Sequence, residues 1–487
     1  MSKGERRTIC QAIALVIGIT LLYMLSRKLK LYQHPVWIQG GMLVFGIALI
    51  QYHMFMYHQK KWSLELLYKS IILFGFAMRI GYMLYTGCEV REHDLRDLTS
   101  NGGGHAGYIL TLIETGKLPN SNDLQYYQQP LFYILGSYAS RIINSALRCT
   151  EPYFLVDAAK VVSCCFSCFT LLAAGKLGEI LKLDKTAKVI SIALIAFLPG
   201  FYLTGGSVVG DAQTAFFMTA AFLYTCRWHE KQSWKNILVL AVIYGLGMMT
   251  KISCGIMAIF TAGVFALVLW NHRKSHELGA IFGKYLAFGC ISFPLGLWYS
   301  LRNYRLFGQT LGYVLRISEE SKIYTGDHSL VQRFILPDIP NLLHSPYGDA
   351  WSDYNLPVYL IKSSLFGEFS YEISDWIPVI LMLSGLILSV IVVISIIHQL
   401  RRRKTDVYGT FAAIAFGIVL SSTVYFYYQY PFGCSMDFRY VLVLGVLGAL
   451  LVGKEFAAEK REWMRRVIVA ETMIYSVFSC LMFLFIR

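Results

Sequence analysis

Long apolar segments separated by short charged loops dominate this chain. Runs of about 18 to 24 mostly apolar residues recur from one end of the sequence to the other, and a helix of that length crosses a hydrocarbon core of roughly 30 Å. Strands of a membrane barrel would instead alternate apolar and polar residues over about ten positions. Because a segment inside lipid must satisfy its own backbone hydrogen bonds, the runs predict an all-α polytopic membrane protein.

The composition supports this class and sets the expected architecture. The chain has 487 residues, of which 56% are hydrophobic and 15% are charged, whereas soluble domains are about 25% charged. We expect one polytopic domain over residues 1–487, built as a bundle of about 13 transmembrane helices with two long outer loops that carry interfacial helices. The expected spans lie near 8–26, 36–57, 67–87, 153–176, 186–205, 209–226, 236–250, 252–270, 280–300, 375–398, 409–428, 438–455 and 466–486.

The distribution of lysine and arginine predicts the orientation. The formal net charge is +14, but most cations lie in short loops on one side of the predicted bundle, as the positive-inside rule requires, and they need no nucleic acid to explain them. Arg27, Lys28 and Lys30 break the pattern, because they would lie outside. The predicted inner loops are 59–61, 176–188, 227–235, 271–284, 399–404 and 454–466.

This orientation brings many polar residues to one face. The long loops 88–152 and 301–374 lie outside, and residues 130–147 form an amphipathic interfacial helix; if that helix spanned the membrane, the rest of the topology would invert. We therefore expect a multi-pass protein of a bacterial plasma membrane whose site faces outside.

Asp94 is the first candidate for chemistry. It follows a span in the sequence E-H-D-L-R-D, where a carboxylate in a partly desolvated cleft can act as a general base; the alternative is a loop carboxylate paired with Arg91 or Arg96. His93 and His105 offer substrate contacts and, with Asp94, ligands for a divalent metal, or they make ordinary loop hydrogen bonds.

Three cations stand at the predicted outer ends of spans: Lys251, Arg302 and Arg439. They either bind a phosphate or reach the lipid headgroups by snorkelling. Asp211 either contacts substrate or caps the span that it begins. Arg79 lies inside a span and needs a partner that the sequence does not identify.

Other polar residues of the long loops are candidates for sugar contacts. Tyr127 and Gln128 offer a phenol and an amide to sugar hydroxyls, although aromatic residues also line membrane interfaces. In the second loop, Glu368 and Trp351 are candidate acceptor contacts.

The order and spacing of several motifs resemble the GT-C membrane glycosyltransferases, in particular the protein O-mannosyltransferase and aminoarabinose transferase branch and bacterial family 39 enzymes. The resemblance covers about residues 71–440. Its motifs are H-D at 93–94, G-H-A-G-Y-I at 104–109, Y-Y-Q-Q-P-L-F-Y at 126–133, L-P-G-F-Y-L-T-G-G-S-V-V-G-D at 198–211, G-L-G-M-M-T-K-I-S-C-G at 245–255, P-L-G-L-W-Y-S-L-R-N-Y-R-L-F-G at 294–308, K-S-S-L-F-G-E-F-S at 362–370 and C-S-M-D-F-R-Y at 434–440.

The resemblance implies a polyprenyl-phosphate-linked sugar donor, with Asp94 as the base and the outer cations on the donor phosphate. It implies an acceptor glycan, lipid or protein, with membrane lipid around the bundle. The chain departs from the family's motifs at two places, which bear on the acceptor and on any metal. Val209 and Gly210 replace two asparagines that relatives often have, and residues 128–133 lack the histidines that relatives often have there. A divalent metal is therefore unsupported, and the cofactor is unknown.

We interpret the chain as an inverting glycosyltransferase that moves a sugar to an acceptor hydroxyl at the outer face. The rival hypotheses are a transporter or flippase of a lipid-linked saccharide, and a catalytically impaired relative. Transporters favour internal repeats and polar groups at the bilayer midplane, whereas here the polar residues stand at the outer ends of spans and no repeat is visible.

Overall fold

The computed structural model describes residues 3–122, 124–337, 339, 342 and 352–486, with side chains from Thr8 onward. Helices account for the regular structure of these residues, apart from an isolated bridge between Tyr324 and Phe432. Trp351, one of the candidate acceptor contacts, lies outside the described residues. The expected all-helical class is confirmed.

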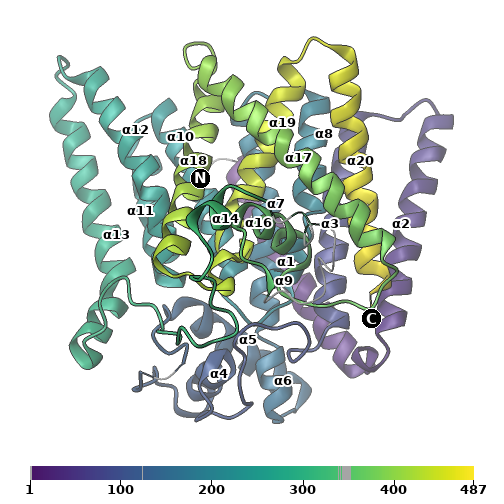
Figure 1. Cartoon of the computed structure of the whole chain (residues 1–487), viewed down its shortest axis with the longest axis vertical. Coiled ribbons are helices and arrows are strands. Elements are labelled where there is room, and N and C mark those ends of the chain that lie inside the picture. The colour runs from purple at the N-terminus through teal and green to yellow at the C-terminus, as the bar shows by residue number, and fades with distance from the viewer. Residues whose placement is uncertain (1–2, 123, 338, 340–341, 343–351, 487) are drawn as a thin grey trace.

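Long helices run along one direction of the molecule, and the short helices of residues 104–157 gather at one end of it (Figure 1). The helices that form the bundle are α1 (Lys3–Lys28), α2 (Pro35–His58), α3 (Leu64–Tyr85), α7 (Lys160–Ile180), α8 (Lys185–Ala196), α10 (Asp211–Glu230), α11 (Trp234–Thr250), α12 (Met257–His272), α13 (Leu278–Phe307), α17 (Trp376–Arg401), α18 (Val407–Gln429), α19 (Val443–Ala458) and α20 (Glu462–Phe485). The shorter elements are η1 (Leu31–Gln33), α4 (Gly104–Thr115), α5 (Leu131–Leu147), α6 (Pro152–Asp157), α9 (Pro199–Gly205), η2 (Ile252–Ile256), α14 (Leu330–Phe334), α16 (Leu356–Phe366), η4 (Gly433–Met436) and η5 (Phe438–Val441).

Each expected span coincides with a helix or a helix pair. Among the described residues, nine helical segments are long and apolar enough to cross a membrane, or up to 11 if two bent pairs count as single spans. Those pairs are α8 with α9, bent by 47°, and 433–441 with α19, bent by 57°. The remaining two expected spans are α10, which is more polar, and α11, which has 17 residues. The chain is therefore a multi-pass helical membrane protein.

The local sequence sets where several helices begin. The side chains of Ser63, Ser233 and Asp406 accept hydrogen bonds from backbone amides in the first turns of α3, α11 and α18, which satisfies groups that a helix N-terminus leaves free. At the other end of the molecule, α13 closes on Gly308 at φ 67°, a left-handed conformation that glycine adopts without strain.

The centre of the bundle is formed by α7, α8, α10 and α19. The helix pair α6–α7 has 72% of its apolar window buried, against 11% for α1, α2 and α13, so the latter three lie at the periphery. Arg79 is fully buried beside this core. It donates to Ser167 and to the backbone carbonyls of Gly75, Ile195 and Ala196; the described contacts include no carboxylate.

A buried ion cluster explains the unusual charge at the end of α1. Arg27 and Lys160 both pair with Asp157, and Tyr23 donates to the same carboxylate. Lys160 also donates to the carbonyl of Thr86 at 2.5 Å, where the loop after α3 begins. Arg27 is thus held by a carboxylate inside the protein, which accounts for its position against the charge rule.

The helices α4, α5 and α6 lie together at one end of the bundle, which we call the α4–α6 end (Figure 1). The amphipathic segment 130–147 forms α5 there, packed against α4, α6 and the start of α7. It is not among the membrane-crossing helices of the described chain, as expected for an interfacial helix. The turns 206–210 and 430–437 reach the same end.

Candidate functional site

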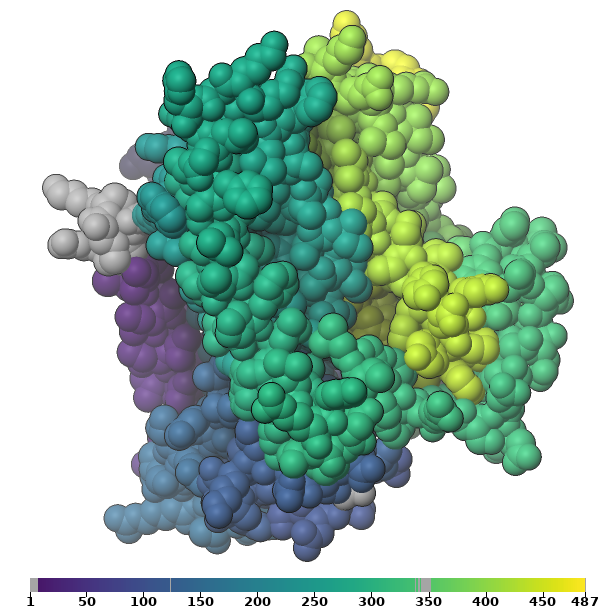
Figure 2. Space-filling model, turned by 90° about the vertical axis from the view of Figure 1, so that its left-hand side faces the viewer, coloured from purple at the N-terminus to yellow at the C-terminus, as the bar shows by residue number. Residues whose placement is uncertain are grey.

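A cavity of about 460 Å³ opens at the α4–α6 end of the bundle. Figure 2 shows a hollow between the α12–α13 side of the molecule and the α18 side, and the cavity lies between these walls. Its charged and amide-bearing residues include members of the loop after α3, the loop 125–129, the start of α10, the end of α11 and η5; its apolar residues include Ile252, Ile256, Leu311, Val314, Phe426 and Val441. One part of the cavity is therefore charged and the other is suited to hydrocarbon.

Asp94 reaches this cavity from the loop after α3. Its backbone has φ 50°, a conformation that aspartate tolerates better than most residues, and its carbonyl accepts from the amide of His105 at the start of α4. The side chain is 48% exposed. The carboxylate is thus fixed at the cavity and still open to a bound molecule.

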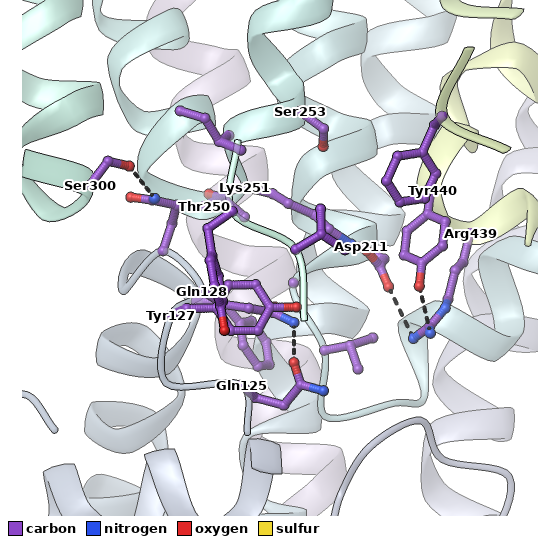
Figure 3. Close-up of a pocket in the computed structure, with 18 of the residues that line it drawn as sticks. Gln125, Tyr127, Gln128, Asp211, Thr250, Lys251, Ser253, Ser300, Arg439 and Tyr440 are labelled. Carbon is purple, nitrogen blue, oxygen red and sulfur yellow. Dashed lines mark hydrogen bonds and ion pairs between the residues drawn. The ribbon is translucent and has the colours of Figure 1, made fainter. Parts of the chain in front are cut away.

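Two cations and one buried carboxylate face Asp94 across the cavity. Lys251 Nζ lies 2.5 Å from Asp211 Oδ1, and Arg439 Nη1 lies 3.9 Å from Asp211 Oδ2. Arg439 Nη2 also lies 3.9 Å from Asp94 Oδ2. Figure 3 shows Asp211 between Lys251 and Arg439. Arg439 therefore links the two carboxylates, and both cations have carboxylate partners within the protein.

Tyr440 and Asp437 hold these cations in place. Arg439 donates to the Tyr440 hydroxyl at 3.0 Å, and the ammonium of Lys251 lies 4.4 Å from the centre of the Tyr440 ring (Figure 3). Asp437 Oδ2 lies 3.3 Å from Arg439 Nε, and Asp437 Oδ1 accepts from the Arg439 amide. An arginine with three carboxylate neighbours and an aromatic contact stays charged and keeps its orientation.

His93 and Glu368 join the two long loops behind the cavity. His93 Nδ1 lies 2.5 Å from Glu368 Oε1, and the imidazole contacts the ring of Phe369 at 4.7 Å between ring centres, with an angle of 44° between the rings. Burial alone would raise the pKa of Glu368, but the charge and hydrogen bond of His93 and the charge of Arg439 lower it to about 2. Glu368 is therefore ionised at neutral pH, and the pair fastens the loop after α16 to the loop of Asp94.

One group of ligand-type side chains in the described chain has metal-like spacing. The candidate ligand atoms of His93, Glu368 and Asp437 lie within 4.8 Å of one another, and such atoms suit a divalent ion. His93 Nδ1 is already bonded to Glu368, however, and Arg439 already supplies a positive charge to Asp437. Of the metal ligands considered from the sequence, the group includes only His93.

A further carboxylate supports the loop. Both oxygens of Glu92 accept from the amide of Val208 at 3.1 Å, which ties the loop of Asp94 to the turn before Asp211. Burial raises the pKa of Glu92 well above its usual value, although Lys160 and the Val208 amide act in the opposite direction. Glu92 therefore joins the loop of Asp94 to the turn that leads into α10.

The structure brings most of the candidate residues to one cavity and places three elsewhere. Arg302 does not line it: its guanidinium donates to the carbonyl of Pro119 at 2.7 Å and to Asn303 at 3.0 Å, and it stacks over Tyr299. His93 and Glu368 pair behind the wall. The candidates that line the cavity are Asp94, His105, Tyr127, Gln128, Asp211, Lys251 and Arg439.

Sequence reasoning missed several residues that shape the cavity. Asp437 stands two positions before Arg439 in C-S-M-D-F-R-Y. This spacing indicates a contact between the two residues, because a carboxylate there reaches both the amide and the side chain of the arginine. Tyr440 belongs to the same motif. Tyr133 and Ser300 carried no signal, because an isolated hydroxyl in an apolar run is ordinary.

The fold and the cavity together define a multi-pass helical membrane protein with a charged cavity at one end and apolar walls beside it. Residues 157–298 match the model of the dolichyl-phosphate-mannose-protein mannosyltransferase family. The match agrees with the resemblance to the GT-C membrane glycosyltransferases that the sequence motifs indicate. No curated protein sequence matches the chain.

Three solved structures are similar in arrangement at low sequence identity. The Archaeoglobus fulgidus oligosaccharyltransferase in the apo form has a TM-score of 0.46 at 13% identity over 85% of this chain and 56% of its own, so this chain spans about half of that protein's length. ArnT from Cupriavidus metallidurans has a TM-score of 0.35 at 11% identity over 78% of this chain and 70% of its own in the apo state. Its form bound to undecaprenyl phosphate has a TM-score of 0.38 at 13% identity over 86% and 75%.

Proposed function

We propose that the chain is an inverting glycosyltransferase that moves a sugar from a polyprenyl-phosphate donor to an acceptor hydroxyl. The observation that carries the proposal is that a carboxylate open to the cavity, Asp94, and two cations, Lys251 and Arg439, line the same cavity. The family model matched by residues 157–298 is named for a dolichyl-phosphate-linked mannose donor. The chemistry of the cavity fits a donor of that kind.

In the proposed reaction, Asp94 accepts the proton of the acceptor hydroxyl as its oxygen attacks the anomeric carbon. The bond from that carbon to the phosphate oxygen breaks, and its electron pair leaves with the polyprenyl phosphate. A single displacement of this kind inverts the anomeric configuration. The exposure of Asp94 allows an acceptor to reach it.

Lys251 and Arg439 would bind the phosphate of the donor. Arginine contacts phosphate through two parallel N–H groups, and lysine adds a point charge. Negative charge grows on the phosphate as the sugar leaves, so cations fixed in advance stabilise the transition state more than the ground state. Both cations now face Asp211, which the incoming phosphate would partly replace.

The apolar wall supports a lipid-linked donor rather than a soluble one. Ile252 and Ile256 of η2 and Phe426 of α18 all line the cavity. A polyprenyl chain leaving the phosphate along this wall would pass between helices of the membrane region. We propose that the α4–α6 end lies on the outer face, because the lysine-rich and arginine-rich turns occupy the opposite end of the bundle.

The proposal is tested with purified protein in nanodiscs. A radiolabelled dolichyl-phosphate-mannose is offered with membrane extract as the acceptor source, and labelled product is separated from lipid. Because the donor sugar is unidentified, mass spectrometry of lipids that co-purify with the protein selects the second donor to test. Transfer by the wild type and its loss in Asp94→Asn support the proposal; transfer at an undiminished rate by the variant contradicts it.

The same material separates the enzyme from a transporter of lipid-linked saccharides. Protein is reconstituted into vesicles with a fluorescent glycosyl polyprenyl phosphate, and the accessibility of the sugar to an added lectin is followed on both faces. Movement of the intact lipid without cleavage of the sugar–phosphate bond would favour the transporter. Cleavage with release of polyprenyl phosphate would favour the transferase.

A further inference from the structure

We propose that His105 presents an unprotonated Nε2 to the cavity and that this nitrogen accepts a hydrogen bond from a hydroxyl of the bound saccharide. The position of the proton on the His105 ring is set by a chain of hydrogen bonds through Gln125, Gln128, Tyr133 and His105. The identity of the ligand rests on the proposed function, whereas the position of the proton does not.

The direction of the chain follows from its first bond. Gln128 Nε2 donates to Gln125 Oε1 at 2.6 Å, as Figure 3 shows. The other end of the Gln128 amide is then its oxygen, which accepts the hydroxyl proton of Tyr133 at 3.2 Å. A phenol has only one proton to give. The Tyr133 oxygen must therefore accept from its second neighbour, His105 Nδ1, at 2.7 Å.

A neutral imidazole carries its single proton on one of its two nitrogens. If Nδ1 holds the proton for Tyr133, Nε2 keeps a lone pair. The ring is neutral at physiological pH, because burial lowers the pKa of His105 to about 4. Nearby charges act on that pKa in both directions: Asp94 and Asp211 raise it, and Arg439 and Lys251 lower it.

The ring is buried, oriented and aimed at the cavity. His105 is 2% exposed and lines the cavity wall. It stacks on Tyr133 with an angle of 17° between the rings, and Tyr133 stacks on Tyr108 at 3.8 Å. Within the described part of the chain, Nε2 makes no hydrogen bond. Nε2 is not among the side-chain atoms of the described chain that are fully buried without a partner, so it is open to the cavity, where a donor from a ligand or from water can reach it.

An acceptor nitrogen at this place selects among ligand groups. A phosphate or carboxylate oxygen would face a lone pair and gain nothing, whereas a sugar hydroxyl can donate to it. Lys251 and Arg439 have the opposite preference, because both only donate. The cavity thus has separate positions for an anion and for a hydroxyl, and His105 belongs to the second. Tyr133 and Gln128 act as positioning residues that keep the lone pair on Nε2.

The first test observes the proton directly and does not depend on transferase activity. Protein labelled with ¹⁵N in its histidine rings is examined in lipid by magic-angle-spinning NMR near pH 7, and the signals of His105 are identified by their loss in His105→Gln. We expect a protonated Nδ1 and an unprotonated Nε2. A protonated Nε2, or a doubly protonated ring, overturns the proposal.

The positioning role has a matched pair of variants. Tyr133→Phe keeps the stacked ring but removes the acceptor of the Nδ1 proton, so the proton should shift in part to Nε2. Tyr108→Phe removes a hydroxyl from the other ring of the stack, which donates to Tyr299 and not to this chain, and it should leave the His105 signals unchanged. Identical spectra of Tyr133→Phe and wild type contradict the proposed chain.

The second test measures binding with two lipids, dolichyl phosphate and dolichyl-phosphate-mannose. Loss of one hydrogen bond weakens affinity by about tenfold. His105→Met, which has no comparable acceptor, should lose this factor, whereas His105→Gln, which can place an oxygen near the Nε2 position, should recover part of it. If only the mannosyl lipid is affected, the hydroxyl belongs to the donor sugar.

An acceptor hydroxyl is probed by adding methyl α-mannoside to protein saturated with dolichyl-phosphate-mannose, because the donor sugar then occupies its own position. Weaker binding of this saccharide to His105→Met, with lipid binding unchanged, assigns the hydroxyl to the acceptor. The proposal is overturned if neither saccharide is affected, or if both lipids weaken equally, because an equal loss means that His105 only maintains the shape of the cavity.

Discussion

The guanidinium of Arg439 lies 3.9 Å from the carboxylate of Asp94, although the two residues come from opposite ends of the chain. Asp94 belongs to the loop after α3, and Arg439 belongs to η5 just before α19. This contact places the proposed base and one proposed phosphate ligand on the same cavity.

Asp94→Asn should lower sugar transfer by about a hundredfold to ten-thousandfold, the usual contribution of a general base, while donor binding is retained. The amide keeps the size of the side chain but cannot take the proton. Asp97→Asn is a matched control, because Asp97 is an exposed carboxylate of the same loop that does not line the cavity. Similar losses in both variants would point to a general effect on the loop.

Lys251→Met should weaken binding of dolichyl phosphate about tenfold to a hundredfold, because a hydrogen bond to a charged group contributes about 1.5 to 3 kcal/mol. Arg302→Met provides the comparison, since Arg302 lies outside the cavity wall and donates to Pro119. It should leave phosphate affinity unchanged and lower the melting temperature. Titration with dolichyl phosphate, followed by quenching of the protein's fluorescence, measures the phosphate affinity. Thermal unfolding in detergent measures the melting temperature.

Asp211→Asn should tighten the binding of dolichyl phosphate several-fold. Asp211 pairs with Lys251 and faces Arg439, so a phosphate must compete with it for both cations. The neutral amide removes that competition and leaves more positive charge for the ligand. Weaker binding would mean that Asp211 acts mainly by holding the cations in position. The affinity of bare dolichyl phosphate at constant ionic strength decides between these outcomes.

Asp157→Asn should destabilise the protein by about 3 to 5 kcal/mol, because it leaves Arg27 and Lys160 buried without a counter-charge. Glu179→Gln is the control: its ion pair with Lys176 is roughly half exposed, so its loss should change stability by less than about 1 kcal/mol. The unfolding free energies of the two variants are compared by titrating the protein in a mild detergent with a denaturing detergent. Equal stability of the two variants contradicts the prediction.

The stability of the protein should fall as the pH drops from about 6.5 toward 4, in part through His105. Burial lowers the pKa of His105 from 6.5 to about 4 in the folded protein, so in this window the unfolded chain binds a proton that the folded protein excludes. The contribution of His105 to the unfolding free energy is fully present above pH 6.5 and decreases by about 3 kcal/mol by pH 4. His105→Gln should show a shallower pH dependence, and an unchanged slope would contradict the assignment.

Helix positions were predictable because they depend on neighbouring residues. The apolar runs exceed the thickness of a bilayer, and residues such as Ser63 and Asp406 cap helices from side chains a few positions away. The amphipathic pattern of 130–147 likewise predicted α5. The residues Asp94, Lys251 and Arg439 were accessible to the same reasoning, because a polar residue at the end of an apolar run stands out.

The interaction partners of the polar side chains were less predictable than the positions of the helices. Arg302 and Lys251 look alike in the sequence, since each ends a span, yet Arg302 turns to the carbonyl of Pro119 and Lys251 turns to Asp211. The rotation of a helix about its axis decides which way its last side chain points, and that rotation depends on packing against helices far away in the chain. For the same reason, Arg27 could not be matched with Asp157 in advance.

Hydropathy and charge along the chain were enough to establish a multi-pass helical protein and to mark its polar ends, because the cost of exposing the backbone to lipid acts on each segment separately. Which polar ends share a cavity, which cations are already neutralised and where the proton of His105 lies depend on distances between segments far apart in the sequence. Only the packed bundle sets those distances, since they follow from how thirteen helices and two loops fill space together.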